Sequence, residues 1–221
     1  MKYLEYAEAN LRRIVESLEF KQYAQGNPYA EVDFAHVLNV SYITRELWLR
    51  RFRTKPPVAI KISGLFHDCD RFFPKERVDT SKASAEEYET KKLEHSKKCA
   101  RIFQRENPDL PTRLKDDVVY MIERHEVGGD KINGRLIEVF DKFTSSFNLN
   151  VSSDILQEGD GMDFFFTILP KYIEWAPPER VREKIKFSYN KLSPIGQQMV
   201  KERKYTDEKI REIIMSTIDK N

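Results

Sequence analysis

The four histidines of this chain all fall between residues 36 and 125, and each lies on the apolar side of its own predicted helix. They are His36, His67, His95 and His125. Their spacing is about thirty residues, the length of one helix with its connection. An imidazole on an apolar face is costly to bury unless another group binds it. The pattern therefore predicts a helical bundle with one shared polar site, and a metal ion is the partner that four imidazoles have in common.

Helical periodicity gives each histidine its position. His36 has Val32 and Val40 four residues to either side, and His95 has Cys99 four residues after it. Similar apolar spacings surround the other two. A single histidine on such a face is more often a core residue bonded to a carbonyl. Four of them with no surface histidine favour convergence on a metal.

Asp68 follows His67 directly and places a carboxylate beside an imidazole. This combination of oxygen and nitrogen donors suits Zn, Mn, Fe or Ni better than Ca or Cu. Gly64 lies on the same side of the predicted helix, where it would let a neighbouring backbone approach closely. Two helices are therefore expected to meet near His67.

The order of these residues resembles the HD-domain superfamily of metal-dependent phosphohydrolases. In that order His36 comes first, followed by the His67-Asp68 pair, then His95 and His125, then a later aspartate. The segment from Gly64 to Phe72 is similar to the strongest part of the family signature. The resemblance covers about residues 30–170. It implies an all-α HD-type helical bundle within a single domain, 1–221, that carries a C-terminal helical extension at about 178–221.

The resemblance leaves two candidates for the last aspartate. Asp160 is favoured because the aromatic run that begins at Phe164 fits a subset of the family, although Gly159 and Gly161 flank it where the family has an uninterrupted helix. Asp141, expected on a helix at 135–147, is the alternative. For either residue the non-functional interpretation is a solvated helix carboxylate.

The resemblance also implies roles for the site residues. One divalent cation (Mn, Zn, Fe, Ni, Co or Mg) would be held by His36, His67, Asp68 and Asp160. His95 and His125 would either bind a second ion, with Asp68 between the two, or bind substrate phosphate and protonate the leaving oxygen. A metal lowers the pKa of bound water toward ~7, which favours hydrolysis of a phosphoester. The catalytic set is therefore expected to be Asp68, His95, His125 and Arg71.

The expected substrate is a small phosphorylated molecule, with nucleotides among the candidates. Arg71 is the best candidate for a phosphate contact, and other cations lie on or beside the polar loop at 74–84: Lys75, Arg77, Lys82, Lys91 and Lys92. Glu126 is a candidate to support His125. Two other functions stay open, a di-iron oxygenase on the same fold and a metal-stabilised signalling or binding module.

Composition is consistent with a cytoplasmic enzyme. The 38 basic and 36 acidic side chains leave a net charge of +2, so no strong nucleic-acid signal exists. Cys69 and Cys99 are expected to be buried thiols. The N-terminus is too charged for a signal peptide, and no apolar run is long enough to enter a membrane. The apolar stripe of the tail is expected to pack on the core, or alternatively to form a homodimer interface.

Helices are expected almost throughout, with a capping box formed by Ser84 and Glu87 and no convincing strand. The expected ranges are 2–24, 31–52, 57–69, 84–103, 112–125, 135–147, 160–175, 179–191, 194–204 and 207–219.

Overall fold

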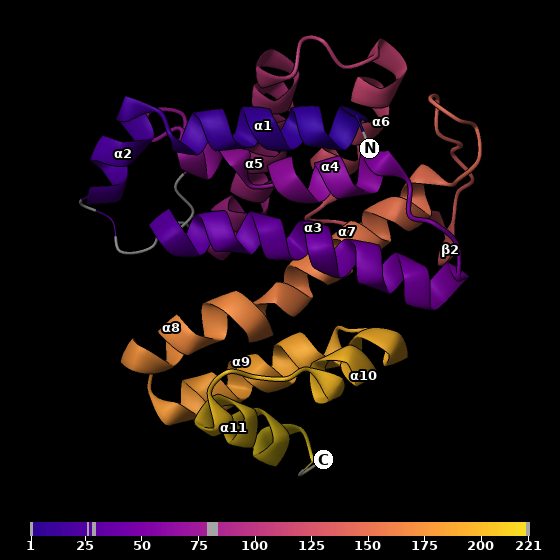
Figure 1. Cartoon of the computed structure of the whole chain (residues 1–221). Coiled ribbons are helices and arrows are strands. Elements are labelled where there is room, and N and C mark those ends of the chain that lie inside the picture. Colours follow the sequence, from indigo (N-terminus) through magenta and orange to yellow (C-terminus); the bar gives the residue numbers. More distant parts are fainter. Residues whose placement is uncertain (1, 26, 28–29, 79–83, 220–221) are drawn as a thin grey trace.

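Helix α3 (Ala30–Phe52) is the element on which much of the chain packs (Figure 1). The computed structural model describes residues 2–25, 27, 30–78 and 84–219. The other helices are α1 (Lys2–Val15), α2 (Leu18–Gln25), α4 (Val58–Phe66), α5 (Ala85–Glu106), α6 (Thr112–Arg124), α7 (Leu149–Asp163), α8 (Leu169–Trp175), α9 (Pro178–Asn190), α10 (Pro194–Glu202) and α11 (Glu208–Ile218). A 3₁₀ turn, η1 (Cys69–Phe72), follows α4, and a π-helical turn, η2 (Phe164–Ile168), joins α7 to α8. The predicted all-α class is confirmed.

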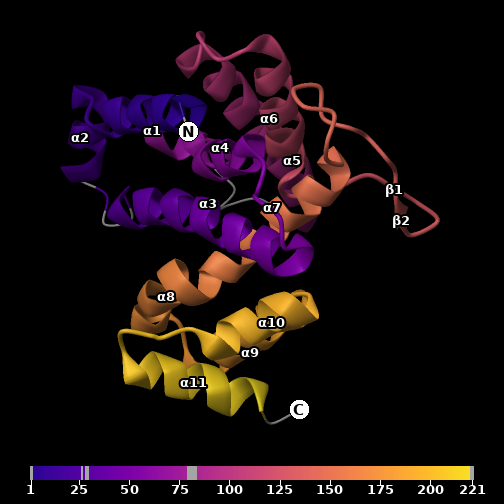
Figure 2. The same ribbon diagram turned by 45° about the vertical axis from the view of Figure 1, so that its right-hand side comes forward.

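The helices form layers around α3. Helix α4 packs between α1 and α3, and α5 pairs with α6, which contacts both α4 and α7. Helix α7 passes α3 and leads to the C-terminal helices, which lie on the other side of α3 in both views (Figures 1 and 2). There α10 packs on α3 and α7, and α9 packs on α11. The domain limits drawn from the sequence stay a prediction.

Two glycines allow the close helix approaches that shape the centre of the fold. A Cβ atom on Gly64 of α4 would lie 2.6 Å from the Cα of Ser41 in α3. A Cβ atom on Gly159 of α7 would lie 2.5 Å from Cγ2 of Thr44, also in α3. Helix α7 runs uninterrupted through Gly159 and Gly161. The absent side chain at Gly159 thus serves helix packing and does not break the helix.

Three local predictions were wrong. The helix expected at 160–175 begins earlier, because α7 already starts at Leu149 and η2 separates it from α8. The expected helix at 2–24 is two helices, because the Ser17 hydroxyl accepts a hydrogen bond from the Phe20 amide (3.2 Å) and starts α2 there. The expected helix at 135–147 is absent. In its place a short hairpin pairs β1 (Lys131–Ile132) with β2 (Arg135–Leu136), and a loop follows. The turn residues have positive φ, 51° at Asn133 and 76° at Gly134, as an Asn-Gly hairpin turn requires.

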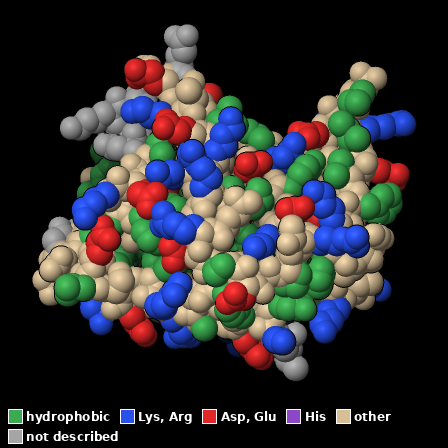
Figure 3. All heavy atoms as spheres, turned by 90° about the horizontal axis from the view of Figure 1, so that it is seen from above, with side chains coloured by type: hydrophobic (Ala, Val, Ile, Leu, Met, Phe, Trp, Pro, Cys, Tyr) green, Lys and Arg blue, Asp and Glu red, His purple; other side chains and the backbone are tan. Residues whose placement is uncertain are grey.

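Several other expectations are met. Ser84 and Glu87 form the predicted capping box at the start of α5. Cys69 and Cys99 are free thiols in the interior. On the face seen in Figure 3 basic and acidic side chains are interspersed and no histidine is visible.

None of the helices in the described part of the chain has the length and apolarity needed to cross a bilayer. Residues 79–83, including Lys82, lie outside the described residues.

Candidate metal centre

Five helices, α3 to α7, bring the predicted site residues together, and α7 contributes Asp160. His36 lies within α3 and His95 within α5, whereas His67 and His125 occupy the C-caps of α4 and α6. Asp68 follows His67. All four imidazoles are buried, with exposed fractions of 8% or less. The apolar stripes that predicted the inward direction of the histidines therefore do point them to the interior.

The first group of ligand atoms surrounds His36 and His67. Their Nε2 atoms lie 3.1 Å apart. Asp68 Oδ2 is 3.2 Å from the His36 Nε2 atom and 3.8 Å from that of His67. Asp160 Oδ1, from α7, is 3.2 Å from His36 Nε2 and 3.5 Å from His67 Nε2. Two nitrogen and two oxygen donors thus converge on one point, which is a donor set that a divalent cation can accept.

The second group uses the other oxygen of Asp68. Asp68 Oδ1 lies 2.8 Å from Nε2 of His95 and 3.6 Å from Nε2 of His125. These three side chains also have the proximity and burial of a metal-binding group. The carboxylate of Asp68 therefore stands between two pairs of imidazoles, with one oxygen toward each pair.

The outward ring nitrogen of every imidazole is held by an acceptor. The Nδ1 contacts are His36 to Asp163 Oδ2 at 2.7 Å, His67 to the Gly64 carbonyl at 2.9 Å, His95 to Asp70 Oδ2 at 2.9 Å, and His125 to the Ile122 carbonyl at 2.7 Å. Carbonyl and carboxylate oxygens only accept, so each Nδ1 carries a proton. The four Nε2 atoms are consequently directed at the site, as in ligating histidines whose second nitrogen is fixed by an acceptor.

Sequence reasoning missed Asp163 and Asp70 as these acceptors. Asp163 is fully buried three residues after Asp160 on the same helix, and its second oxygen accepts a hydrogen bond from the Thr167 hydroxyl (2.7 Å). Asp70 is fully buried two residues after Asp68. A carboxylate one helical turn from an expected ligand was the available signal for Asp163.

The pKa values of the site groups reflect an excess of negative charge. Burial lowers the pKa of His36, but hydrogen bonds that its ring donates to Asp160, Asp163 and Asp68 outweigh it and hold that pKa well above its usual range. Burial raises the pKa of Asp160, but hydrogen bonds to His36 and His67 outweigh it and leave it lowered. Burial likewise raises the pKa of Asp68, but Arg71 and His67 hold it well below its usual range. Asp68 and Asp160 thus stay ionised, and their negative charge favours the protonated form of His36.

One buried atom is left without a partner at this centre. His125 Nε2 has no hydrogen-bond partner among the described residues, although it is buried. A buried polar atom without a partner costs about 1–3 kcal/mol. Because its Nδ1 is protonated, this Nε2 offers a lone pair, and the nearest charged atom is the Asp68 oxygen 3.6 Å away. A cation between the two would satisfy both, so the residues present fit a metal ion.

A small cavity of about 120 Å³ borders the second group. Its lining residues are Asp70, Arg71, Arg77, Val78, Tyr88, Lys92, His95 and Glu126. Arg71 donates from Nη1 to Asp33 Oδ1 (2.9 Å) and pairs through Nη2 with Asp68 Oδ2 (2.6 Å). Lys92 pairs with Glu126 at 3.2 Å. The predicted cations Arg71, Arg77 and Lys92 therefore face this space, whereas Lys75 pairs with Glu19 away from it.

Asp141, the alternative to Asp160, lies in the loop before α7 and organises that loop. Its Oδ2 accepts from the Thr144 amide (2.5 Å) and hydroxyl (2.8 Å), and its Oδ1 accepts from the amides of Ser146 (2.7 Å) and Phe147 (3.0 Å). All these contacts are within the loop. The structure therefore places Asp160, and not Asp141, beside the imidazoles.

Comparison with known proteins gives one result. The family model for the HD domain matches residues 33–146, just over half of the 221-residue chain. The match includes the four histidines and Asp68 but stops before Asp160, so the position of Asp160 at the site rests on geometry. No curated protein and no solved structure matches the chain significantly. By the family match and the helical fold, the chain belongs to the HD domain family.

Proposed function

We propose that this chain is a metal-dependent phosphohydrolase that cleaves a small phosphate ester, with nucleotides among the candidate substrates. The observation that carries the proposal is the two-sided position of Asp68 between two pairs of imidazoles. His36, His67, Asp68 and Asp160 would hold one divalent ion. Asp68, His95 and His125 would hold a second.

The two-ion form is favoured over a purely substrate-binding role for His95 and His125. Both rings direct Nε2 at Asp68 Oδ1, and the His125 Nε2 atom is otherwise unpartnered among the described residues. Bound divalent ions supply Lewis acidity, which lowers the pKa of a water molecule toward ~7 and offsets charge on phosphoryl oxygens. Protein groups must then position the substrate and keep the ligands fixed.

The cations around the small cavity divide into two roles. Both terminal nitrogens of Arg71 are engaged by carboxylates, Asp33 and Asp68. We therefore assign Arg71 as a positioning residue that holds Asp68 in its bridging orientation. Arg77 and Lys92 line the same cavity and are assigned to the phosphoryl oxygens, because charge-assisted bonds from such cations suit phosphate.

A fourth cation approaches from the C-terminal helices. Lys184 of α9 lies over the Phe164 ring, 5.6 Å from its centroid. Its pKa is lowered by partial burial and by the positive charges of Lys191 and Lys92, and Asp160 acts in the opposite direction. Lys92 lines the cavity and Asp160 belongs to the first ligand group, and the charges of both act on Lys184. We infer that α9 contributes positive charge toward an incoming phosphate.

Metal analysis of the purified chain, followed by a phosphatase and phosphodiesterase screen with added Mn, Co, Ni, Zn, Fe or Mg, tests this function. We expect bound metal and metal-dependent release of phosphate or of a nucleoside monophosphate. His67→Ala and Asp68→Ala should abolish metal binding and turnover together. Asp116→Asn, a change in a surface carboxylate paired with Lys142, is the control and should affect neither.

Three outcomes would contradict the proposal. Bound metal without turnover on any phosphoester would favour a metal-stabilised binding module. Oxygen consumption by the reduced iron form would favour an oxygenase. A correctly folded chain that binds no divalent ion in the screen would contradict all three functions: phosphohydrolase, metal-stabilised binding module and oxygenase.

A further inference from the structure

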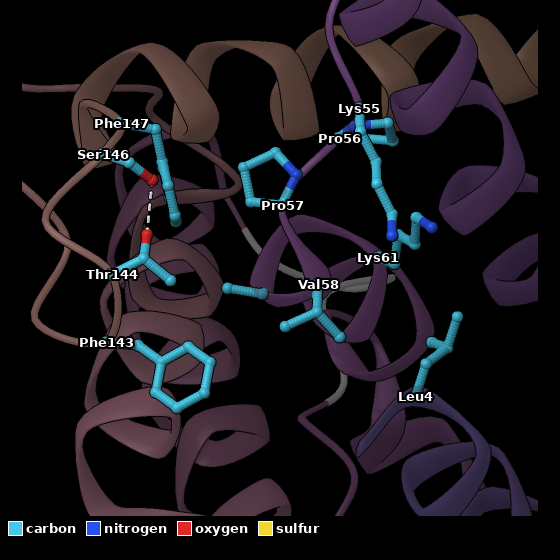
Figure 4. Close-up of a pocket in the computed structure, with 11 residues that line it drawn as sticks. Leu4, Lys55, Pro56, Pro57, Val58, Lys61, Phe143, Thr144, Ser146 and Phe147 are labelled. Carbon is cyan, nitrogen blue, oxygen red and sulfur yellow. Dashed lines mark hydrogen bonds between the residues drawn. The ribbon is translucent and has the colours of Figure 1, made fainter. Parts of the chain in front are cut away.

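A larger cavity of about 310 Å³ lies at the other end of α4 from the metal centre (Figure 4). Its lining residues are Leu4, Lys55, Pro56, Pro57, Val58, Ala59, Lys61, Phe143, Thr144, Ser146 and Phe147. Helix α4 begins at Val58, next to the cavity, and ends just before His67. At about 1.5 Å per residue the two sites are separated by roughly 13 Å along this helix. We call this space the α4 N-terminal pocket, and nothing in the proposed function uses it.

The walls of the pocket are largely apolar. In Figure 4 Phe143 and Phe147 lie on one side, Leu4 lies opposite, and Pro57 and Val58 lie between them. Phe147 is buried, and Phe143, Leu4 and Val58 pack against the hydrophobic core. Such surfaces favour a flat apolar group over a hydrated ion.

Two lysines supply the charge at the edge of this apolar space. In Figure 4 the side chain of Lys55 extends toward Lys61. Neither ammonium group has an ion-pair partner within the described residues. Partial burial and the positive charges of Arg45 and Lys55 lower the pKa of Lys61, and the negative charge of Glu8 acts in the opposite direction. Like charges held together are unfavourable until an anion lies between them.

The start of α4 also favours an anion in this pocket. Pro57 occupies the N-cap and no side chain caps the helix. The first amide groups of α4 therefore face the pocket end of the helix without a side-chain acceptor, which favours negative charge there.

The hydroxyl groups of the pocket are already committed. The Thr144 hydroxyl donates to Asp141 Oδ2 at 2.8 Å, and the Ser146 oxygen lies 2.5 Å from that of Thr144 (Figure 4). With the Thr144 proton directed at Asp141, the Ser146 proton must be shared with Thr144. Lys55 and Lys61 are consequently the side-chain donors left for a ligand.

We propose that the α4 N-terminal pocket binds a small organic anion whose ring-sized apolar body lies between Phe143, Phe147 and Leu4 and whose acidic group lies at Lys55 and Lys61. The cavity has the size of the smaller ligand sites in proteins, which begin at about 300 Å³. Apolar walls with a few convergent polar groups are the usual composition of such sites. Inorganic phosphate alone would leave the apolar walls uncovered and is expected to bind poorly.

Titration of the full-length chain with naphthalene-1-sulfonate, measured by isothermal calorimetry, tests the proposal. The neutral naphthalene-1-sulfonamide and inorganic phosphate serve as ligand controls. We expect saturable binding of the sulfonate that weakens as salt is raised, with binding of either control about tenfold weaker or more. Removal of metal with a chelator should leave sulfonate binding unchanged, which distinguishes this pocket from the metal centre.

Variants locate the site. The double variant Lys55→Gln/Lys61→Gln should weaken sulfonate binding about tenfold or more, and Ser146→Trp, at an exposed rim position, should block it. Lys97→Gln/Lys209→Gln changes two exposed lysines elsewhere and should have no effect. Equal binding by all variants, or equal binding of the sulfonamide, would overturn the proposal.

A second measurement avoids dependence on the folding of variants. Reductive methylation of the unmodified chain, read by mass spectrometry, should be slowed by the sulfonate at Lys55 and Lys61 and not at Lys97. Modification of all three lysines at unchanged rates under saturating sulfonate would refute the assigned location.

Discussion

Substitution of two aspartates, Asp160→Asn and Asp141→Asn, should separate metal binding from fold stability. Both residues follow the last histidine in the chain, and either one fits the order of the family. The structure gives them different surroundings: Asp160 faces two imidazoles, and Asp141 faces the donors of its own loop. Asp160→Asn should consequently lose metal affinity, and Asp141→Asn should lose stability of the fold.

The cost of Asp141→Asn follows from its hydrogen bonds. The carboxylate of this buried residue accepts four, two on each oxygen. An asparagine keeps one oxygen and turns an NH₂ group toward the two donors of the other. A buried donor left without an acceptor costs about 1–3 kcal/mol, and most of these donors are only partly buried, so the free energy of unfolding should fall by about 2–4 kcal/mol. Metal affinity should not change.

Asp160→Asn should instead weaken the binding of the cation. The Asp160 side chain is 30% exposed, and its Oδ1 lies near the Nε2 atoms of His36 and His67. Asparagine has the same size, its oxygen can still accept from one imidazole, and Asp68 and Asp163 keep their charges beside His36, so the metal-free stability should fall by only about 1 kcal/mol. Loss of an anionic ligand should exceed the ~10–100-fold effect of losing a supporting group, so metal affinity should fall by at least ~100-fold.

Urea unfolding in the presence of chelator and competition titration with a metal-sensitive dye measure the two quantities separately. If Asp141→Asn strips the cation while the metal-free fold keeps its stability, the assignment of Asp160 from geometry is wrong. Equal loss of metal in both variants, with wild-type unfolding curves, would refute the separation itself.

The pH dependence of Asp141 gives an independent control. Burial raises the pKa of Asp141, but hydrogen bonds from the Phe147 amide and from Thr144 outweigh it and leave the pKa lowered. A lowered folded-state pKa stabilises the fold above the ordinary aspartate value of about 4, and this stability is lost as pH falls through the lowered value. The gap in unfolding free energy between wild type and Asp141→Asn should therefore close in acid. A gap that stays constant or widens below pH ~4 would contradict this account.

Three further predictions concern the support of the centre and its helices. Asp163→Asn removes the charge that holds His36 Nδ1 and should weaken metal binding about 10–100-fold in the same dye titration; unchanged affinity would exclude Asp163 as a support. Gly64→Ala forces a Cβ to within 2.6 Å of the Ser41 Cα and should lower the free energy of unfolding by about 1–3 kcal/mol. Gly161→Ala lies in α7, where the new Cβ meets no atom within 4 Å, and should raise the free energy of unfolding by about 0.5–1 kcal/mol. Changes of the same sign in urea unfolding of both variants would refute the packing argument. Metal at ~100 times its dissociation constant should stabilise the chain by about 2.7 kcal/mol, and chelator should reverse the shift in melting temperature. An unchanged melting temperature at saturating metal would contradict selective binding to the folded chain.

The sequence alone determined the helical class and the inward direction of the four histidines. Both follow from periodicity, because residues three and four apart share a face of a helix whatever the helix packs against. The capping box at Ser84 is equally local, since its donors and acceptors lie within four residues. The Asn133-Gly134 turn is also a local signal, but the apolar residues after it fit a helical stripe as well, so the sequence alone does not predict the hairpin.

Only the tertiary structure decided which acids meet which imidazoles. Asp160 and Asp141 are both plausible by chain order, and Asp163 and Asp70 have no motif of their own. Their partners depend on how far each helix is rotated and shifted against its neighbours, and the close contacts at Gly64 and Gly159 limit this for α4 and α7 on α3. A shift of one residue turns a helical side chain by about 100° and removes it from the centre, so ligand geometry is a property of interhelical packing and not of local sequence.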